Sequence, residues 1–138
     1  MDAGFELFDH TADVGVRAFS PTLAGLVAPA SWGLYTVIGE LVTGDAADEL
    51  RFDAIGESAE LLRDYLAELL FAFERRGLMA ASHSVEAFER DCLKVQAALH
   101  RVDLERSVFY REVKAVTYHE LSIRPIEGGY EVRYIVDI

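Results

Sequence analysis

The most constraining feature of this sequence is its final segment, Tyr130–Ile138, which is typical of a β-strand that runs to the last residue. Chain ends usually fray, so a strand at this position holds the terminal carboxylate in place. The segment sets the side-chain carboxylate of Asp137 next to the main-chain carboxylate of Ile138, and a second acidic cluster, which includes Asp13, lies within residues 9–15. If the fold brings the two ends of the chain together, their oxygen atoms form a cation site.

The composition predicts a single domain over residues 1–138. A chain of 138 residues that is 51% hydrophobic and 27% charged is long and apolar enough to bury a sizeable core. Its formal net charge of −11 repels phosphate groups, whereas tight nucleic-acid binding relies on Lys and Arg to neutralise them. Direct binding of RNA or DNA is therefore disfavoured, and the charge agrees with solubility in a crowded cytosol.

Three features favour a cytoplasmic protein with no membrane role. The single cysteine, Cys92, excludes an internal disulfide and indicates a reducing compartment. Residues 1–6 carry acids where a signal peptide carries basic residues, so secretion is not expected. Residues 18–39 contain no charged side chain, but their polar residues and prolines dilute the hydrophobicity, and the larger apolar residues follow one helical face.

Two helices are expected. The first spans about residues 20–38, opening with a serine cap and a proline at the first helical position, and Pro29 predicts a kink or a break inside it. The second is the clearest element in the chain and covers residues 59–76. Ser58 is its expected cap, and Gly77 lies where a left-handed C-cap belongs.

Most other segments alternate apolar and polar residues as strands do. The first two expected strands pair with each other, one containing Phe5 and Leu7 and the other Val14, Val16 and Ala18. The remaining expected strands are residues 50–56, 79–88, 92–99, 113–121, 122–126 and 130–136. Few helices and many antiparallel strands predict an α+β fold, a two-layer sandwich built mainly of antiparallel sheet with two principal helices.

Three carboxylates far apart in the sequence are candidate metal ligands, namely those of Asp13, Asp137 and the terminus at Ile138. They are hard oxygen donors without cysteine, which suits Ca²⁺, Mg²⁺ or Mn²⁺, although surface acids are most often simply solvated. His10 and His119 are candidates for orienting these acids, for metal ligation or for general-base roles. A hard cation does not require imidazole, so a histidine that is simply satisfied by a carboxylate or a carbonyl is favoured over metal ligation, and both residues stay candidates for orienting the acidic groups.

One further residue is a functional candidate. Lys114 interrupts a run of β-branched residues, where the ordinary explanation is a solvated lysine at a sheet edge. No nucleophile stands out, because Thr22, Ser58 and Cys92 are each expected to be structural.

Three blocks of the sequence resemble the archease family. They read His10-Thr11-Ala12-Asp13-Val14-Gly15, Val113-Lys114-Ala115-Val116-Thr117-Tyr118-His119 and Val136-Asp137-Ile138. The resemblance implies metal ligands at Asp13, Asp137 and Ile138 and functional importance for Lys114. It also implies an accessory protein of the RtcB-type RNA ligase, which joins tRNA halves after intron removal. Archeases help that ligase form its covalent guanylate intermediate and turn over repeatedly, and they do not join RNA themselves.

The sequence departs from the family in the first helix. Archeases commonly carry acids on the exposed face there, whereas this chain has Ala24, Gly25, Ala28 and Pro29. Two other functions remain open. One is a free-standing metal-dependent hydrolase that uses Asp13, Asp137 and a histidine base. The other is a chaperone-like or small-molecule binding module in which the acidic cluster only fastens the termini.

Overall fold

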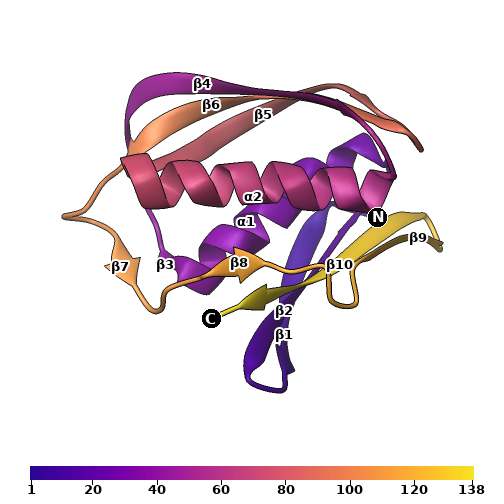
Figure 1. The fold of residues 1–138 in the computed structure, drawn as a ribbon, viewed down its shortest axis with the longest axis horizontal. Coiled ribbons are helices and arrows are strands. Elements are labelled where there is room, and N and C mark those ends of the chain that lie inside the picture. The colour runs from indigo at the N-terminus through magenta and orange to yellow at the C-terminus, as the bar shows by residue number, and fades with distance from the viewer.

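The computed structural model describes residues 1–138 as two helices and ten strands (Figure 1). Every strand pair is antiparallel, and the expected α+β class is confirmed. The helices are α1 (Val27–Ile38), which follows a 3₁₀ turn at Ala24–Leu26, and α2 (Ser58–Arg76). The strands are β1 (Gly4–His10), β2 (Asp13–Ser20), β3 (Gly39–Glu40), β4 (Thr43–Ile55), β5 (Leu78–Phe88), β6 (Cys92–Val102), β7 (Val108–Phe109), β8 (Ala115–Val116), β9 (Ser122–Ile126) and β10 (Gly129–Asp137).

The five-stranded sheet joins the two ends of the chain. Its order is β1-β2-β10-β8, and β9 also pairs with β10. The last strand, β10, therefore lies inside the sheet and not at its edge, and the prediction that a strand runs to the end of the chain is confirmed. A three-stranded sheet, β4-β6-β5, and the short pair of β3 and β7 complete the fold.

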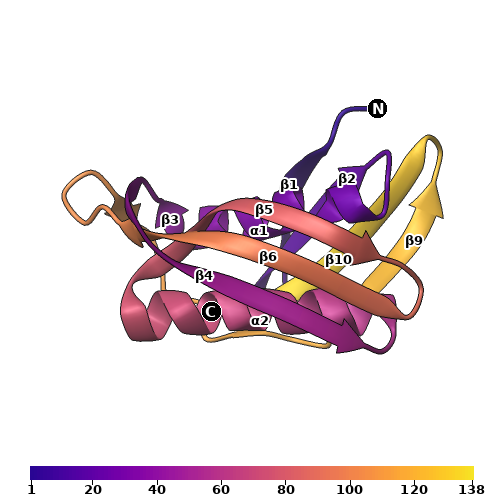
Figure 2. The same ribbon diagram turned by 90° about the horizontal axis from the view of Figure 1, so that it is seen from above.

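Both helices lie between the two larger sheets (Figures 1 and 2). Helix α1 packs on β1 and β2 and also touches β5, while α2 contacts β5, β6 and β8. Burying apolar faces from both sides gives one continuous core. Fully buried members of this core include Leu34, Tyr65, Leu66, Leu99, Val132 and Tyr134.

The first helix begins later than the sequence predicts. Ser20 is the last residue of β2, and its hydroxyl accepts a hydrogen bond from the N–H of Thr22 instead of capping a helix. Helix α1 starts at Val27, so Pro29 falls in its first turn, where backbone N–H groups have no intrahelical acceptor. Proline is tolerated there without a kink.

The second helix matches its predicted range and its C-cap but not its N-cap. Ser58 is the first helical residue, and the cap is Glu57, whose carboxylate accepts hydrogen bonds from the N–H groups of Ala59 and Glu60. Gly77 adopts the left-handed conformation, with φ of 65°.

Two strand predictions were wrong in extent. Strand β4 is longer than the predicted segment 50–56, and residues 113–121 form only the short strand β8 followed by a turn. Neither helix has the length and hydrophobicity that a membrane crossing requires.

Candidate metal centre

A tight hairpin between β1 and β2 sets two predicted site residues opposite each other. His10 and Asp13 are the closing pair, so the turn consists of Thr11 and Ala12 alone, and Ala12 has φ of 63°. The loop is thus shorter than the sequence block indicates. In this pair the Nδ1 atom of His10 lies 3.8 Å from Oδ2 of Asp13.

The register between β2 and β10 brings the two acidic segments together. Val136 pairs with Val14 at the end of this antiparallel ladder, and Asp137 and Asp13 are the next residues along the two strands. The fold therefore meets the condition, stated from the sequence, that both ends of the chain reach one place.

The end of the chain is held on its other side by β8. Asp137 pairs with Ala115, and the N–H of Lys114 donates a hydrogen bond of 2.7 Å to the carbonyl of Asp137. The side chain of Ile138 packs against the core, which fixes the position of the terminal carboxylate. Asp13, Asp137 and Ile138 are thus all anchored at one end of the sheet.

Lys114 shares this end of the sheet through its backbone. Its side chain lines a shallow hollow of about 180 Å³ against α2, together with Arg63 and Glu74. It forms no ion pair with Asp13 or Asp137. Lys114 is thus an exposed residue beside α2.

The turn between β8 and β9 carries the second histidine. Thr117 ties it to β10, because both its N–H and its hydroxyl donate to the carbonyl of Ile135 at 2.9 Å. Arg63 of α2 ties it to the helix by donating to the carbonyl of Val116 at 2.8 Å and to the hydroxyl of Tyr118 at 3.0 Å. These contacts hold His119 and the residue after it in a defined position.

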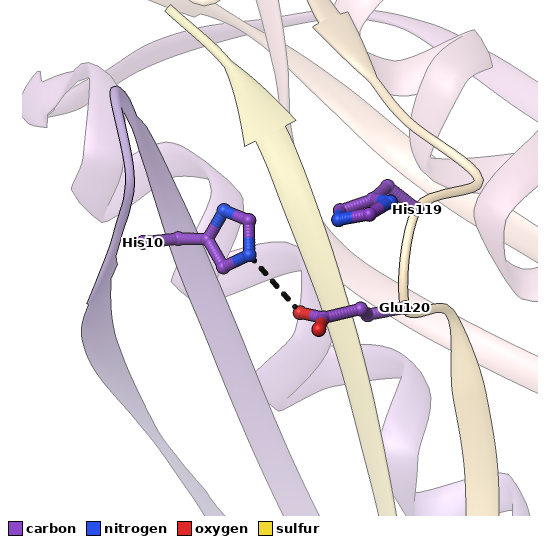
Figure 3. Close-up of side chains that lie close together, drawn as sticks. All are labelled: His10, His119 and Glu120. Atoms are coloured by element: carbon purple, nitrogen blue, oxygen red, sulfur yellow. Dashed lines mark ion pairs between the residues drawn. The ribbon is translucent and has the colours of Figure 1, made fainter.

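Three side chains from these two turns converge, as Figure 3 shows. The nitrogen and oxygen atoms of His10, His119 and Glu120 that can bind a metal all lie within 4.8 Å of one another. The Nε2 atom of His10 is 3.2 Å from Oε2 of Glu120, and the two imidazole rings meet edge to face with centroids 5.3 Å apart.

Glu120 was not predicted from the sequence. It directly follows the block that ends at His119, which was the only available signal, and its position depends on a left-handed backbone conformation with φ of 53°.

Comparisons with known proteins identify the family of this chain. The sequence profile of the archease protein family matches residues 5–138. The chain belongs to the archease family. An archease from Methanopyrus kandleri is 30% identical over 97% of this chain and 99% of its own length, and one from Pyrococcus furiosus is 30% identical over 97% and 98%.

Solved structures confirm the fold. A solution structure of a Methanobacterium thermoautotrophicum protein superposes with a TM-score of 0.77 at 30% identity, covering 98% of this chain and 99% of its own. The crystal structure of an archease from Thermotoga maritima, described as a possible chaperone, gives a TM-score of 0.67 at 15% identity over 96% of both chains. At that identity the second likeness supports the archease fold alone.

One acid of the same sheet, Glu131, is ion-paired with arginine, unlike the acids at this end of the sheet. Glu131 is buried between Arg17 and Arg124, with N–O distances of 3.1 and 3.0 Å. Burial opposes its ionisation, but the two guanidinium groups hold the pKa of Glu131 below its ordinary value. Glu131 is therefore a structural ion pair, whereas Asp13, Asp137 and Glu120 have no Lys or Arg partner.

A second group with metal-ligand chemistry lies at the β5–β6 turn and consists of Glu89, Asp91 and Cys92. Desolvation and the two neighbouring carboxylates raise the pKa of the Cys92 thiol. A thiol must lose its proton to bind a metal, so this group is the weaker candidate in this archease.

Proposed function

We propose that this archease is a metal-binding accessory protein that activates an RtcB-type RNA ligase, promoting the ligase's guanylylation and repeated turnover in tRNA splicing or RNA repair. The observation that carries the proposal is the register of β2, β10 and β8, which gathers the three family blocks at one end of one sheet. The protein acts on the ligase and does not join RNA itself.

The proposal includes a hard cation, Ca²⁺, Mn²⁺ or Mg²⁺, held by Asp13, Asp137 and the terminal carboxylate of Ile138. The donor set fits such an ion, because all three groups offer carboxylate oxygen and the two aspartates directly follow the last residue pair between β2 and β10. When bound, the ion neutralises carboxylates that otherwise repel one another. The same ion orders the end of the chain beside Lys114.

Charge favours a protein partner over RNA. The chain has a net charge of −11 and contains only two lysines, Lys94 and Lys114. RNA binding needs clustered basic residues, so contact with the nucleic acid belongs to the ligase in this proposal. Lys114 is exposed near the end of β10 and supplies a positive charge for a phosphate-bearing group in the ligase. The reduced state implied by the lone Cys92 is consistent with work in the cytoplasm.

The cation is tested by thermal unfolding with a chelator, with Ca²⁺ and with Mn²⁺. A bound ion stabilises the protein by about 2.7 kcal/mol at one hundred times its dissociation constant. Asp13→Asn and Asp137→Asn should abolish this gain, and residues appended after Ile138 should weaken it by converting a carboxylate into an amide. Asp45→Asn, at an exposed acid in β4, and an amino-terminal tag are the controls. A melting temperature that is the same with chelator, with Ca²⁺ and with Mn²⁺ would contradict the cation site.

The ligase role is tested by measuring ligase guanylylation and turnover with and without this protein. Wild type and the controls Lys94→Ala and Asp45→Asn should turn a single-turnover ligase into a multiple-turnover one. Lys114→Ala and Asp13→Asn should fail to do so while remaining folded by circular dichroism. A ligase that is indifferent to the wild-type protein would refute the role.

A second candidate function is a chaperone-like binding module. A cavity of about 420 Å³ opens between α2 and residues 109–113, and the exposed aromatic rings of Phe109 and Tyr110 stand at it. The Thermotoga maritima relative is itself described as a possible chaperone. Suppression of aggregation of an unfolded client that survives Asp13→Asn but not Phe109→Ser would favour this function over the first.

A further inference from the structure

We propose that His10, His119 and Glu120 form a binding site for a borderline divalent transition metal, Zn²⁺ above all, distinct from the hard-cation site of Asp13, Asp137 and Ile138. The inference rests on the arrangement of the three side chains in Figure 3 and does not depend on the ligase role.

The first argument is the environment of His10. Its two ring nitrogens face two different carboxylates, with Nδ1 at 3.8 Å from Asp13 and Nε2 at 3.2 Å from Glu120. A neutral imidazole carries one proton, so it presents an N–H group to only one of them and a lone pair to the other. Nδ1 is in fact the one buried side-chain nitrogen or oxygen in the protein without a hydrogen-bond partner. A cation between Nε2 and Glu120 resolves this conflict.

The second argument is the donor set. Two imidazoles and one carboxylate are a common protein ligand set for Zn²⁺, whereas Ca²⁺ and Mg²⁺ prefer all-oxygen sites. Zinc bonds of about 2.0–2.1 Å at tetrahedral angles separate neighbouring donors by about 3.4 Å. The separation of 3.2 Å between His10 and Glu120 already matches this value. The candidate ligand atoms lie up to 4.8 Å apart, and because His119 is exposed, a rotation of its side chain can bring its nitrogen closer to the other two donors.

The third argument is the shell around these donors. With Nε2 of His10 on the metal, its proton is on Nδ1, which faces Asp13 at 3.8 Å, and a small approach of the two would give the carboxylate–histidine–metal arrangement that fixes a ligating ring. Arg63 and Thr117 hold the turn that carries the other two donors. Three protein ligands leave a fourth position for water or for an oxygen of a bound molecule.

The test is titration of the full-length protein with Zn²⁺ by calorimetry, and with Co²⁺ by visible absorption, in a Cys92→Ser background that removes the other metal-ligand group. We expect one equivalent of Zn²⁺, a Co²⁺ spectrum typical of tetrahedral nitrogen and oxygen ligands, and no displacement by millimolar Ca²⁺. His119→Ala and Glu120→Gln should each abolish this equivalent. Both side chains are exposed, so folding should be preserved.

Two further variants separate this site from its neighbour. Asp13→Asn should weaken Zn²⁺ binding by about 10- to 100-fold, the usual effect of losing a carboxylate behind a ligating histidine. Asp137→Asn should leave it unchanged, although it disrupts the hard-cation site. His100→Gln is the matched control, because its imidazole is bonded to the Gly44 carbonyl elsewhere.

Absence of a stoichiometric Zn²⁺ equivalent, or an equivalent that survives both His119→Ala and Glu120→Gln, would overturn the proposal. In the first case the two carboxylates face His10 without an ion between them.

Discussion

His83 of β5 links both helices to the three-stranded sheet. Its Nε2 lies 2.7 Å from the hydroxyl of Ser31 in α1, and its Nδ1 lies 2.6 Å from the hydroxyl of Tyr65 in α2. The Ser31 hydroxyl donates its one proton to the carbonyl of Ala28 at 2.8 Å, so it can only accept from His83. In the neutral ring the proton is then on Nε2, and the Tyr65 hydroxyl donates to Nδ1.

Acid should destabilise the protein through this residue. Burial lowers the pKa of His83 from 6.5 to about 4, because a charged ring is poorly solvated there. A folded-state pKa below the unfolded value means that the unfolded chain binds the proton more tightly. The stabilisation is thus fully present above pH 6.5 and is lost as the pH falls toward 4. Each pKa unit corresponds to 1.36 kcal/mol, which gives a loss of roughly 2.5 kcal/mol by pH 4.5.

The assay is urea unfolding of the wild type and of His83→Gln at a series of pH values from 7.5 to 4.5. The His83→Gln variant should be less stable at every pH, but glutamine cannot titrate. Between pH 7.5 and 4.5 its free energy of unfolding should therefore fall by roughly 2.5 kcal/mol less than that of the wild type. His100→Gln should keep the wild-type slope. Stopping at pH 4.5 avoids the range in which Glu131, whose pKa is lowered by its two arginines, gains its proton.

Equal slopes for the wild type and His83→Gln would refute the reasoning. An NMR titration would also refute it if the folded protein showed a His83 pKa near the ordinary value of 6.5, because the two hydroxyl oxygens would then accept hydrogen bonds from the charged ring.

Three further changes test local parts of the fold. A methyl group at Gly15 would meet the Phe8 ring at 2.1 Å, so Gly15→Ala should cost about 1–3 kcal/mol in urea unfolding, and far less in a Phe8→Ala background. Gly77→Ala should cost about 1–2 kcal/mol, and Gly77→Asn less, because residue 77 is left-handed although its surroundings are open. Glu57→Ala should cost about 1 kcal/mol through loss of the α2 cap, and an unchanged midpoint would contradict that role.

The sequence by itself determined the features that depend on local pattern. The amphipathic period of α2 and the glycine after it placed that helix, and alternation placed β5, β6, β9 and β10, because burial of one face imposes those periods directly. The closing strand and the family blocks also predicted that Asp13, Asp137 and Ile138 form one site. The predicted start of α1 was wrong. Ser20 and Pro21 are typical of the first residues of a helix, but Ser20 instead pairs with Tyr130 in the β2–β10 ladder.

Only the tertiary structure decided how the site is assembled. The register of β10 against β2 pairs Val136 with Val14 and so brings Asp137 and Asp13 to the same end of the sheet, and a shift of one residue would send every side chain of β10 to the other face. The convergence of Glu120 with His10 joins residues more than a hundred positions apart and depends on a left-handed residue in a turn. No periodicity records such a contact, because it results from the packing of β8, α2 and β10 around that turn.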